Sequence, residues 1–231
     1  MKHHYYYSKQ QKGIDNKTKQ FVIKKCLKYI KRNKVLDIGF VDEVWSKEIL
    51  KKGCQLTIIE KNLYRTKIAK KILKNKKLVK IIRNDIEKIS LKEKFDTIIL
   101  GDCMQYIKRP VNLIKKLKTV LNKNGVLIIT VPNRLSMHRR IGYLLSKNKN
   151  HLWLNDNEKK LGNLRAYDLK KLKNLVKKAS FKKYLIDTCF LKPLSSKQIE
   201  RWPDSILEAL NTVGKELKEY CWFLYAICKK S

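Results

Sequence analysis

The 231-residue chain is 43% hydrophobic, which is enough apolar material to bury the core of one domain. No apolar run approaches the ~20 residues that a membrane-spanning helix needs, so a helical membrane protein is not expected. The formal net charge of +35 comes from 55 basic and 20 acidic residues and predicts attraction to polyanions. Because 46 of the basic residues are lysines spread along the chain, two interpretations stay open: a compositional bias, and a real anionic partner such as RNA or a membrane surface.

Cysteine usage favours a reducing compartment, because the six cysteines form no CxxC pair and four of them lie in or beside apolar segments. We therefore predict buried free thiols rather than disulfides, and no metal site. The first seven residues are rich in His and Tyr and lack the apolar stretch of a secretion signal. Together these features favour a cytoplasmic protein, and they leave its oligomeric state open.

The first half of the chain predicts strands that alternate with helices after a polar start. Residues 1–16 are predicted to form a flexible N-terminal arm, and 17–231 a single domain whose first helix spans 17–31. Five strands are then predicted, with helices of similar length between them, which indicates a parallel sheet with right-handed crossovers. The strands are expected at 34–38, 55–60, 78–82, 95–100 and 125–131, and the helices at about 42–52, 62–74 and 110–122.

The second half of the chain has a different rhythm. A polar insertion is expected at about 147–165, and two late apolar strands flank a helical stretch over 195–218. Two such strands fit an antiparallel extension at one edge of the sheet. The remaining elements are predicted as helices at 134–146 and 168–178 and strands at 184–191 and 220–228.

The most informative local feature is the run from Val35 to Gly39, which Glu60 follows 21 positions after the glycine. An apolar strand ends on Asp-x-Gly, a helix follows, and a second apolar strand ends on a carboxylate. The glycine lets the backbone turn tightly beneath a ligand, and a carboxylate at this spacing accepts hydrogen bonds from ribose hydroxyls. The layout therefore indicates a nucleoside-binding α/β unit.

Over residues of about 17–230 the sequence resembles the class I S-adenosylmethionine-dependent methyltransferases. The resemblance implies a Rossmann-like α/β fold: a mostly parallel seven-stranded sheet with helices on both faces and an antiparallel edge hairpin. The tail, with SMHRR (136–140) and FLKPLSSKQIERWP (190–203), is similar to a subgroup of glycan- and small-molecule-modifying enzymes. The phrases that carry the resemblance are VLDIG (35–39), TIIEKN (57–62), IIRNDIEKI (81–89), FDTIILGD (95–102) and PVNLIKKLKTVLNKNGVLIITVPN (110–133).

This resemblance implies S-adenosylmethionine as the cofactor, held at the carboxyl ends of the strands. Asp37 and Gly39 would frame the turn beneath the methionine part of the cofactor. Glu60 would hold the ribose diol through two charge-assisted hydrogen bonds.

The third and fourth strands carry the remaining cofactor residues that the resemblance implies. Asp85 would accept a hydrogen bond from the adenine amino group, and Ile86 would pack on the ring. Gly101 and Asp102 would close the fourth strand, where the sulfonium and the methyl acceptor meet.

The acceptor is predicted to be a small molecule, a sugar or a glycan precursor that is methylated on oxygen. An oxygen acceptor reacts faster when a base removes its proton, and His138, which follows the fifth strand, is the candidate general base. A purely structural role for this histidine is the alternative. The residues predicted to contact the acceptor are Tyr106, Arg139, Arg165 and Tyr167.

The turn after the first strand departs from the family pattern. Family members usually carry further glycines soon after the first. In the subgroup that this chain resembles, a small residue and a glycine would stand where it has Val41 and Glu43. Their bulk opposes a close backbone approach, and Glu43 adds negative charge near the carboxylate of the cofactor. Two alternatives to a small-molecule enzyme therefore stay open: a noncatalytic protein with a degenerate cofactor turn, and an RNA methyltransferase, which the net charge suggests.

Overall fold

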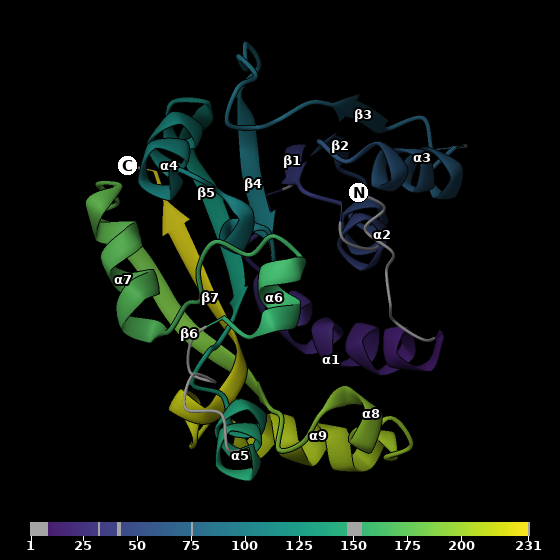
Figure 1. The fold of residues 1–231 in the computed structure, drawn as a ribbon. Helices are drawn as coiled ribbons and strands as arrows, with labels where there is room; N and C mark the ends of the chain where they lie inside the picture. Colours follow the sequence, from purple (N-terminus) through teal and green to yellow (C-terminus); the bar gives the residue numbers. More distant parts are fainter. Residues whose placement is uncertain (1–8, 32, 41–42, 75, 147–153, 231) are drawn as a thin grey trace.

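The computed structural model describes residues 9–31, 33–40, 43–74, 76–146 and 154–230, and they form a seven-stranded sheet covered by helices on both faces (Figure 1). The strands lie in the order β3-β2-β1-β4-β5-β7-β6. Their bounds are β1 (Lys34–Ile38), β2 (Gln55–Glu60), β3 (Val79–Arg83), β4 (Phe95–Gly101), β5 (Leu121–Pro132), β6 (Lys183–Leu191) and β7 (Cys221–Lys229).

Strands β1 to β5 are parallel, and only β7 runs against its two neighbours, β5 and β6. Strand β6 therefore points in the same direction as β5. As a consequence, six strands end at one edge of the sheet, which we call the carboxyl edge, and β7 begins there. This arrangement confirms the predicted mostly parallel sheet with an antiparallel pairing at one side.

Two hydrophobic clusters hold the helices against the sheet. Helices α1, α2, α3, α8 and α9 contribute to the cluster on one face, and α4 and α7 to the cluster on the other. The helix bounds are α1 (Lys9–Leu27), α2 (Val44–Lys51), α3 (Leu63–Ile72), α4 (Pro110–Thr119), α5 (Met137–Leu145), α6 (Asp156–Lys160), α7 (Leu169–Lys178), α8 (Ser196–Ile199) and α9 (Asp204–Val213), with short 3-10 helices η1 (Met104–Tyr106) and η2 (Lys218–Tyr220).

Strand β4 explains why the central strands read as unbroken apolar runs. Ile98 and Leu100 belong to the cluster under α4 and α7, whereas Ile99 belongs to the cluster under α1 and α2. Successive side chains of a strand point to opposite faces, so a sheet covered on both faces needs apolar residues at every position.

Three predicted boundaries are wrong, each for a local reason. Helix α1 begins at Lys9, so the described part of the predicted arm, 9–16, is helical; burial of Ile14 anchors this first part of the helix. Strand β5 begins at Leu121 rather than at 125, and its pairing with β4 changes register between Leu121 and Val126. The helical stretch over 195–218 divides into α8 and α9, because Pro203 is extended and stands before the second helix as its N-cap.

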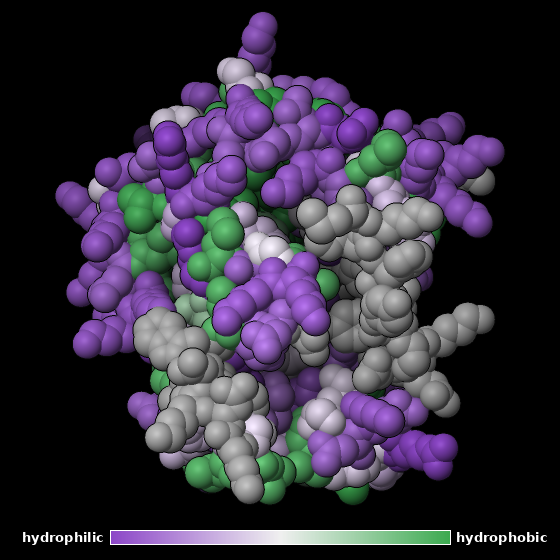
Figure 2. Space-filling view, in the orientation of Figure 1, coloured by the Kyte–Doolittle hydropathy of each residue, from purple (hydrophilic) through white to green (hydrophobic). Residues whose placement is uncertain are grey.

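The surface in Figure 2 is mainly hydrophilic, with small separate hydrophobic areas. Among the described residues, no helix combines the length and apolar character required to cross a membrane. All six cysteines are free and buried, which confirms the prediction. The predicted insertion at 147–165 lies partly outside the described residues, and its described part carries α6.

Candidate active site at the carboxyl edge

The turn after β1 is built around Gly39, whose φ is +86°. Its N–H donates to the carbonyl of Ile59 at 2.9 Å, which ties the turn to the end of β2. A Cβ atom on this residue would lie 3.1 Å from the Cβ of Cys103, beyond the end of β4. Both the positive φ and the close approach require glycine here, and together they bring the ends of β1, β2 and β4 to one point.

The Glu60 carboxylate, which is buried, points at this turn. Its Oε2 accepts the Phe40 N–H at 2.9 Å, and its Oε1 accepts the Asn62 N–H at 2.6 Å. Each carboxylate oxygen has two lone pairs, so each keeps capacity for one more donor. The predicted ribose-binding residue is therefore oriented by backbone groups, and its chemistry fits a pair of vicinal hydroxyls.

Three buried carboxylates gather around Cys103 at this edge. Burial, and then the negative charges of Asp37, Asp102 and Glu60, raise the pKa of the Cys103 thiol well above its ordinary value. The cysteine therefore stays protonated and is a poor nucleophile. The local field instead suits a positively charged ligand, such as a sulfonium or an ammonium group.

Asp102 occupies the left-handed backbone region, with a φ of +51°. Its N–H donates to the carbonyl of Thr130 at 3.1 Å, and its Oδ1 accepts the Thr130 hydroxyl at 3.0 Å. The Nζ of Lys19, in α1, lies 3.6 Å from Oδ2. Residues other than Gly adopt this conformation at a cost, and here β5 and α1 hold the carboxylate in place.

Gly101 and the loop after β3 were predicted to contact the cofactor, and in the structure they contact other parts of the protein. A Cβ on Gly101 would lie 3.0 Å from the indole nitrogen of Trp45, so this glycine makes room for the indole. Ile86 is buried in the core under α4, and Asp85 accepts the N–H of Glu87 at 2.9 Å through Oδ1. The structure therefore gives all three residues local packing or turn contacts, and their contact with a cofactor stays a prediction.

The described side chains that follow Gly39 in the turn point away from the carboxyl edge. Phe40 is buried in the cluster under α1 and α2, and Glu43 forms an ion pair with Lys47 at 2.6 Å on the surface of α2. Val41 lies outside the described residues. Where the turn is described, its side chains thus point into the core or along α2.

His138 lies at the start of α5, beside the end of β6. Its backbone N–H donates to the backbone carbonyl of Lys192 at 3.0 Å. Its ring nitrogen Nδ1 lies 3.2 Å from the hydroxyl of Ser136. Burial, and then the positive charges of Lys192 and Arg139, lower the pKa of this imidazole well below its ordinary value. The ring is therefore neutral near pH 7, as a general base must be.

The predicted acceptor residues are mostly engaged within the protein. Arg139 forms a two-pronged ion pair with Glu158 of α6, at 2.6 and 3.3 Å. Tyr167 is buried in the core, and its hydroxyl donates to the carbonyl of Met104 at 3.4 Å. Arg165 donates to a loop carbonyl 57 residues earlier in the chain, at 3.2 Å. Tyr106 lies in η1 and is half-buried.

One cluster at this edge was missed from the sequence. Lys192, directly after β6, is buried beside Trp222, Ser196 and Asp15. The only sequence signal was a lysine placed directly after an apolar strand, in the run Phe190–Lys192. A buried charge at a strand end is unusual enough to mark a position for attention.

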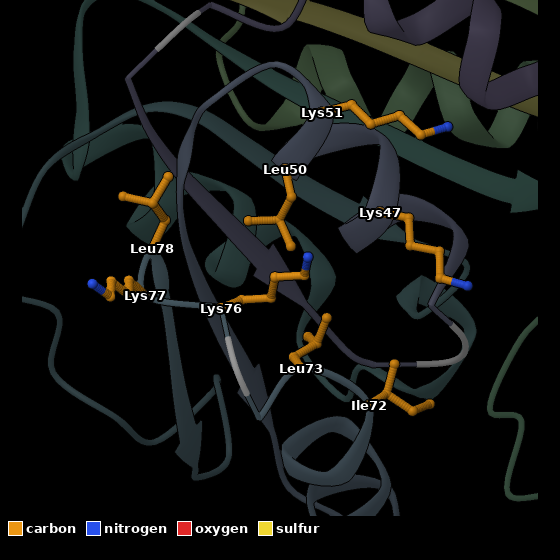
Figure 3. A pocket seen from close by; sticks show the side chains of 8 residues that line it. All are labelled: Lys47, Leu50, Lys51, Ile72, Leu73, Lys76, Lys77 and Leu78. Atoms are coloured by element: carbon orange, nitrogen blue, oxygen red, sulfur yellow. The ribbon is translucent and has the colours of Figure 1, made fainter.

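A separate groove of about 540 Å³ lies between α2 and α3 (Figure 3). Four lysines and four aliphatic side chains line it, including Leu78 at the entry to β3. The groove is thus near the amino ends of β2 and β3, away from the carboxyl edge. Its lining residues are Lys47, Leu50, Lys51, Ile72, Leu73, Lys76, Lys77 and Leu78.

Comparisons with solved structures show which fold this is. The plantazolicin methyltransferase BpumL in complex with SAH is similar with a TM-score of 0.59 at 18% identity, over 96% of this chain and 85% of that one. A SAM-dependent methyltransferase from Archaeoglobus fulgidus matches with a TM-score of 0.61 at 14% identity, over 96% and 95%. A phosphoethanolamine N-methyltransferase from Haemonchus contortus matches with a TM-score of 0.62 at 18% identity, over 91% and 52%.

A comparison with protein families gives the assignment. A search of curated protein sequences finds no match. The sequence model of a family described as "Methyltransferase domain" matches residues 10–185, which hold the turn after β1, the end of β2 and the end of β4. The chain therefore belongs to the methyltransferase domain family and is an S-adenosylmethionine-dependent methyltransferase.

Proposed function

We propose that this methyltransferase methylates an oxygen atom of a small polar acceptor, such as a sugar or a glycan precursor. Bound S-adenosylmethionine supplies an electrophilic methyl group on a sulfonium. Glu60 would hold the ribose and Asp85 the adenine, with Ile86 beside the ring. Asp37 and Gly39 would face the methionine part of the cofactor, and Gly101 and Asp102 the region of the sulfonium.

The placement of His138 beside the end of β6 carries this proposal, together with the burial and the nearby positive charges that lower the pKa of its imidazole. A hydroxyl acceptor loses a proton as it is methylated, and a half-buried neutral imidazole can accept that proton. When Nδ1–H donates to the Ser136 hydroxyl, the second ring nitrogen, Nε2, is the basic one. The histidine lies at the carboxyl edge, where ligands bind in open α/β sheets.

A small acceptor is favoured because helices close over this edge. Lys19 of α1 approaches Asp102, and the ion pair between Arg139 and Glu158 ties α5 to α6. In Figure 1, α1 and α6 lie near the ends of β4 and β5, and α5 lies beyond the end of β5. The similar protein from Haemonchus contortus was solved in complex with phosphomonomethylethanolamine, a small molecule, which supports an acceptor of that size.

RNA is the second candidate acceptor, which the net charge of +35 favours. Phosphate recognition needs cations that are available to the ligand, yet three cations near the carboxyl edge already have acidic partners within the protein. The three pairs are Lys19–Asp102, Arg134–Asp168 and Arg139–Glu158. We therefore place RNA below a small acceptor.

The test is methyl transfer to a panel of hydroxylated small molecules, read as a mass increase of one methylene. His138→Ala should lower kcat by about 10²–10⁴-fold, the usual contribution of a general base, and added imidazole should restore part of it. Rescue is informative because a merely structural histidine would not be replaced by a free base. Loss of folding aside, an unchanged kcat would contradict the assignment of His138, and methylation of RNA alone would contradict the small acceptor.

A further inference from the structure

Lys192 is a buried cation at the acceptor side of the carboxyl edge, and only 3% of it is exposed. Its Nζ lies 3.5 Å above the centre of the Trp222 ring and 2.6 Å from the hydroxyl of Ser196. The nearest carboxylate oxygen, Oδ1 of Asp15, is 3.8 Å away. Four elements thus meet at this side chain: α1, β6, α8 and β7.

The pairing of this ammonium with Asp15 is loose. A charge-assisted hydrogen bond between an ammonium and a carboxylate has a length of about 2.7–2.9 Å, and the observed separation is longer. The Asp15 oxygen instead accepts the Ser196 hydroxyl at 2.6 Å. Burial lowers the pKa of Lys192 to about 8, although Asp15 opposes this shift. A buried charge of this kind reduces stability unless it is fully paired. A role in binding a ligand would explain why a lysine is present at this position.

The surroundings of Lys192 connect it to the reaction site. Its own carbonyl accepts the N–H of His138. Asp15 lies one helical turn before Lys19, and Lys19 approaches Asp102 at the end of β4. A ligand group at Lys192 would therefore lie beside the proposed base and on the same side of α1 as the cofactor end of β4.

We propose that Lys192 binds a phosphate group of the methyl acceptor, and that Asp15 occupies this anion position when no acceptor is bound. The inference deepens the proposed function and rests on it: the acceptor class becomes a phosphorylated small molecule, such as a sugar phosphate. A phosphate offers several acceptor oxygens, which suit the ammonium and the Ser196 hydroxyl together. The Asp15 carboxylate supplies a charge of the same sign from within the chain.

The charges around the position agree with an anionic ligand. On α5, His138 is neutral, and the cation of Arg139 is neutralised by Glu158. Asp15, on α1, is the acidic group that acts on the pKa of Lys192. A phosphate that displaces Asp15 therefore meets the Lys192 cation, while the other carboxylate of this group, Glu158, is already paired with Arg139.

The experiment measures the binding of inorganic phosphate by calorimetry at about pH 7 and about 0.15 M salt, where nonspecific attraction to exposed lysines is screened. Asp15→Asn should bind phosphate about tenfold more tightly than the wild type, because a competing anion is gone. Lys192→Met should bind it at least about tenfold more weakly. The two substitutions act in opposite directions, which a purely structural contact does not predict.

The exposed ion pair between Lys17 and Asp204 provides matched controls, because it also joins α1 to the last third of the chain. Lys17→Met changes the net charge as Lys192→Met does, and Asp204→Asn changes it as Asp15→Asn does. Both controls should leave phosphate affinity unchanged. Equal effects within either matched pair would overturn the proposal, since they would show a response to net charge alone.

Two further outcomes separate this proposal from the proposed function. If Lys192→Met fails to fold, the pair Asp15→Asn and Asp204→Asn decides: unchanged or weaker phosphate binding in Asp15→Asn overturns the inference. Binding of S-adenosylhomocysteine is measured separately in each protein. If the wild-type protein does not bind S-adenosylhomocysteine, the methyltransferase function is contradicted. If it binds S-adenosylhomocysteine but the substitutions do not change its affinity for phosphate, only the proposed phosphate site is contradicted.

Discussion

Replacement of Lys192 by Met should stabilise the protein at pH 7, although it removes a hydrogen bond and a charge pair. Burial lowers the pKa of this lysine from 10.5 to about 8, and this difference corresponds to about 3 kcal/mol of lost stability at pH values below 8. Loss of the contact with the Ser196 hydroxyl should cost about 1 kcal/mol. Met has a similar volume, so the expected net gain is about 1–2 kcal/mol.

The sign of the pH dependence gives a second check on the same variant. Between about pH 8 and 10.5 the unfolded chain keeps the Lys192 proton that the folded protein has lost, so wild-type stability rises through this window. The advantage of Lys192→Met should therefore shrink from pH 7 to pH 10. Urea unfolding of both proteins at several pH values measures this difference, and other lysines cancel in the comparison.

The exposed Lys17 is the control, since Lys17→Met should change stability by less than about 0.5 kcal/mol at any of these pH values. A destabilisation of Lys192→Met by more than about 1 kcal/mol at pH 7 would refute the reasoning. Such a result would mean that the ammonium is a structural link between α1 and α8. Burial of Lys192 would then be explained by this structural contact, without a ligand.

Three further predictions concern the turn, the sheet and the proposed base. Glu60→Ala should weaken S-adenosylhomocysteine binding by about 100-fold or more in calorimetry, because two charge-assisted hydrogen bonds are lost, whereas the surface substitution Glu48→Ala should not. Gly101→Ala should destabilise the protein by about 1–3 kcal/mol in denaturant unfolding, since the new Cβ would lie 3.0 Å from an indole nitrogen. The control Gly142→Ala, in α5, should be neutral or slightly stabilising, because no atom lies within 4 Å of its new Cβ. Because the pKa of His138 is lowered well below 6.5, kcat should stay flat from pH 6.5 to 7.5, and a loss of rate on acidification within that range would count against a neutral base.

The central sheet was predictable because its strands are buried on both faces. Strands β1 and β2 begin and end where the apolar runs do, at 34–38 and 55–60. Helix α1 was harder to place, since its first turns carry many polar residues and Ile14 is the first that the described structure shows buried. Tertiary contacts, rather than helical periodicity, fix where this helix begins.

The acceptor side shows what a sequence pattern cannot supply. Arg139 was predicted to contact the acceptor, and its side chain lies against Glu158 of α6 instead. Lys192, by contrast, had no predicted role, although His138 and Trp222 both lie against it. Residues so far apart in the chain meet only because β5, β6 and β7 place their ends at one edge, and spacing along the sequence carries no information on that meeting.

The altered turn after β1 fits a cofactor-binding enzyme better than the sequence suggested. The sequence raised two concerns there: the bulk of Val41 and Glu43 opposes a close backbone approach, and Glu43 adds negative charge near the cofactor. Glu43 has φ −83° and ψ −5°, which any residue adopts, and it precedes α2 as the N-cap. Only Gly39 needs a positive φ among the described residues of the turn, and the glycine is present there. Because Lys47 holds the Glu43 carboxylate along α2 at 2.6 Å, its charge is offset on the helix surface. The turn therefore retains the one glycine that its described backbone requires, and the substitution at position 43 does not by itself indicate a noncatalytic protein.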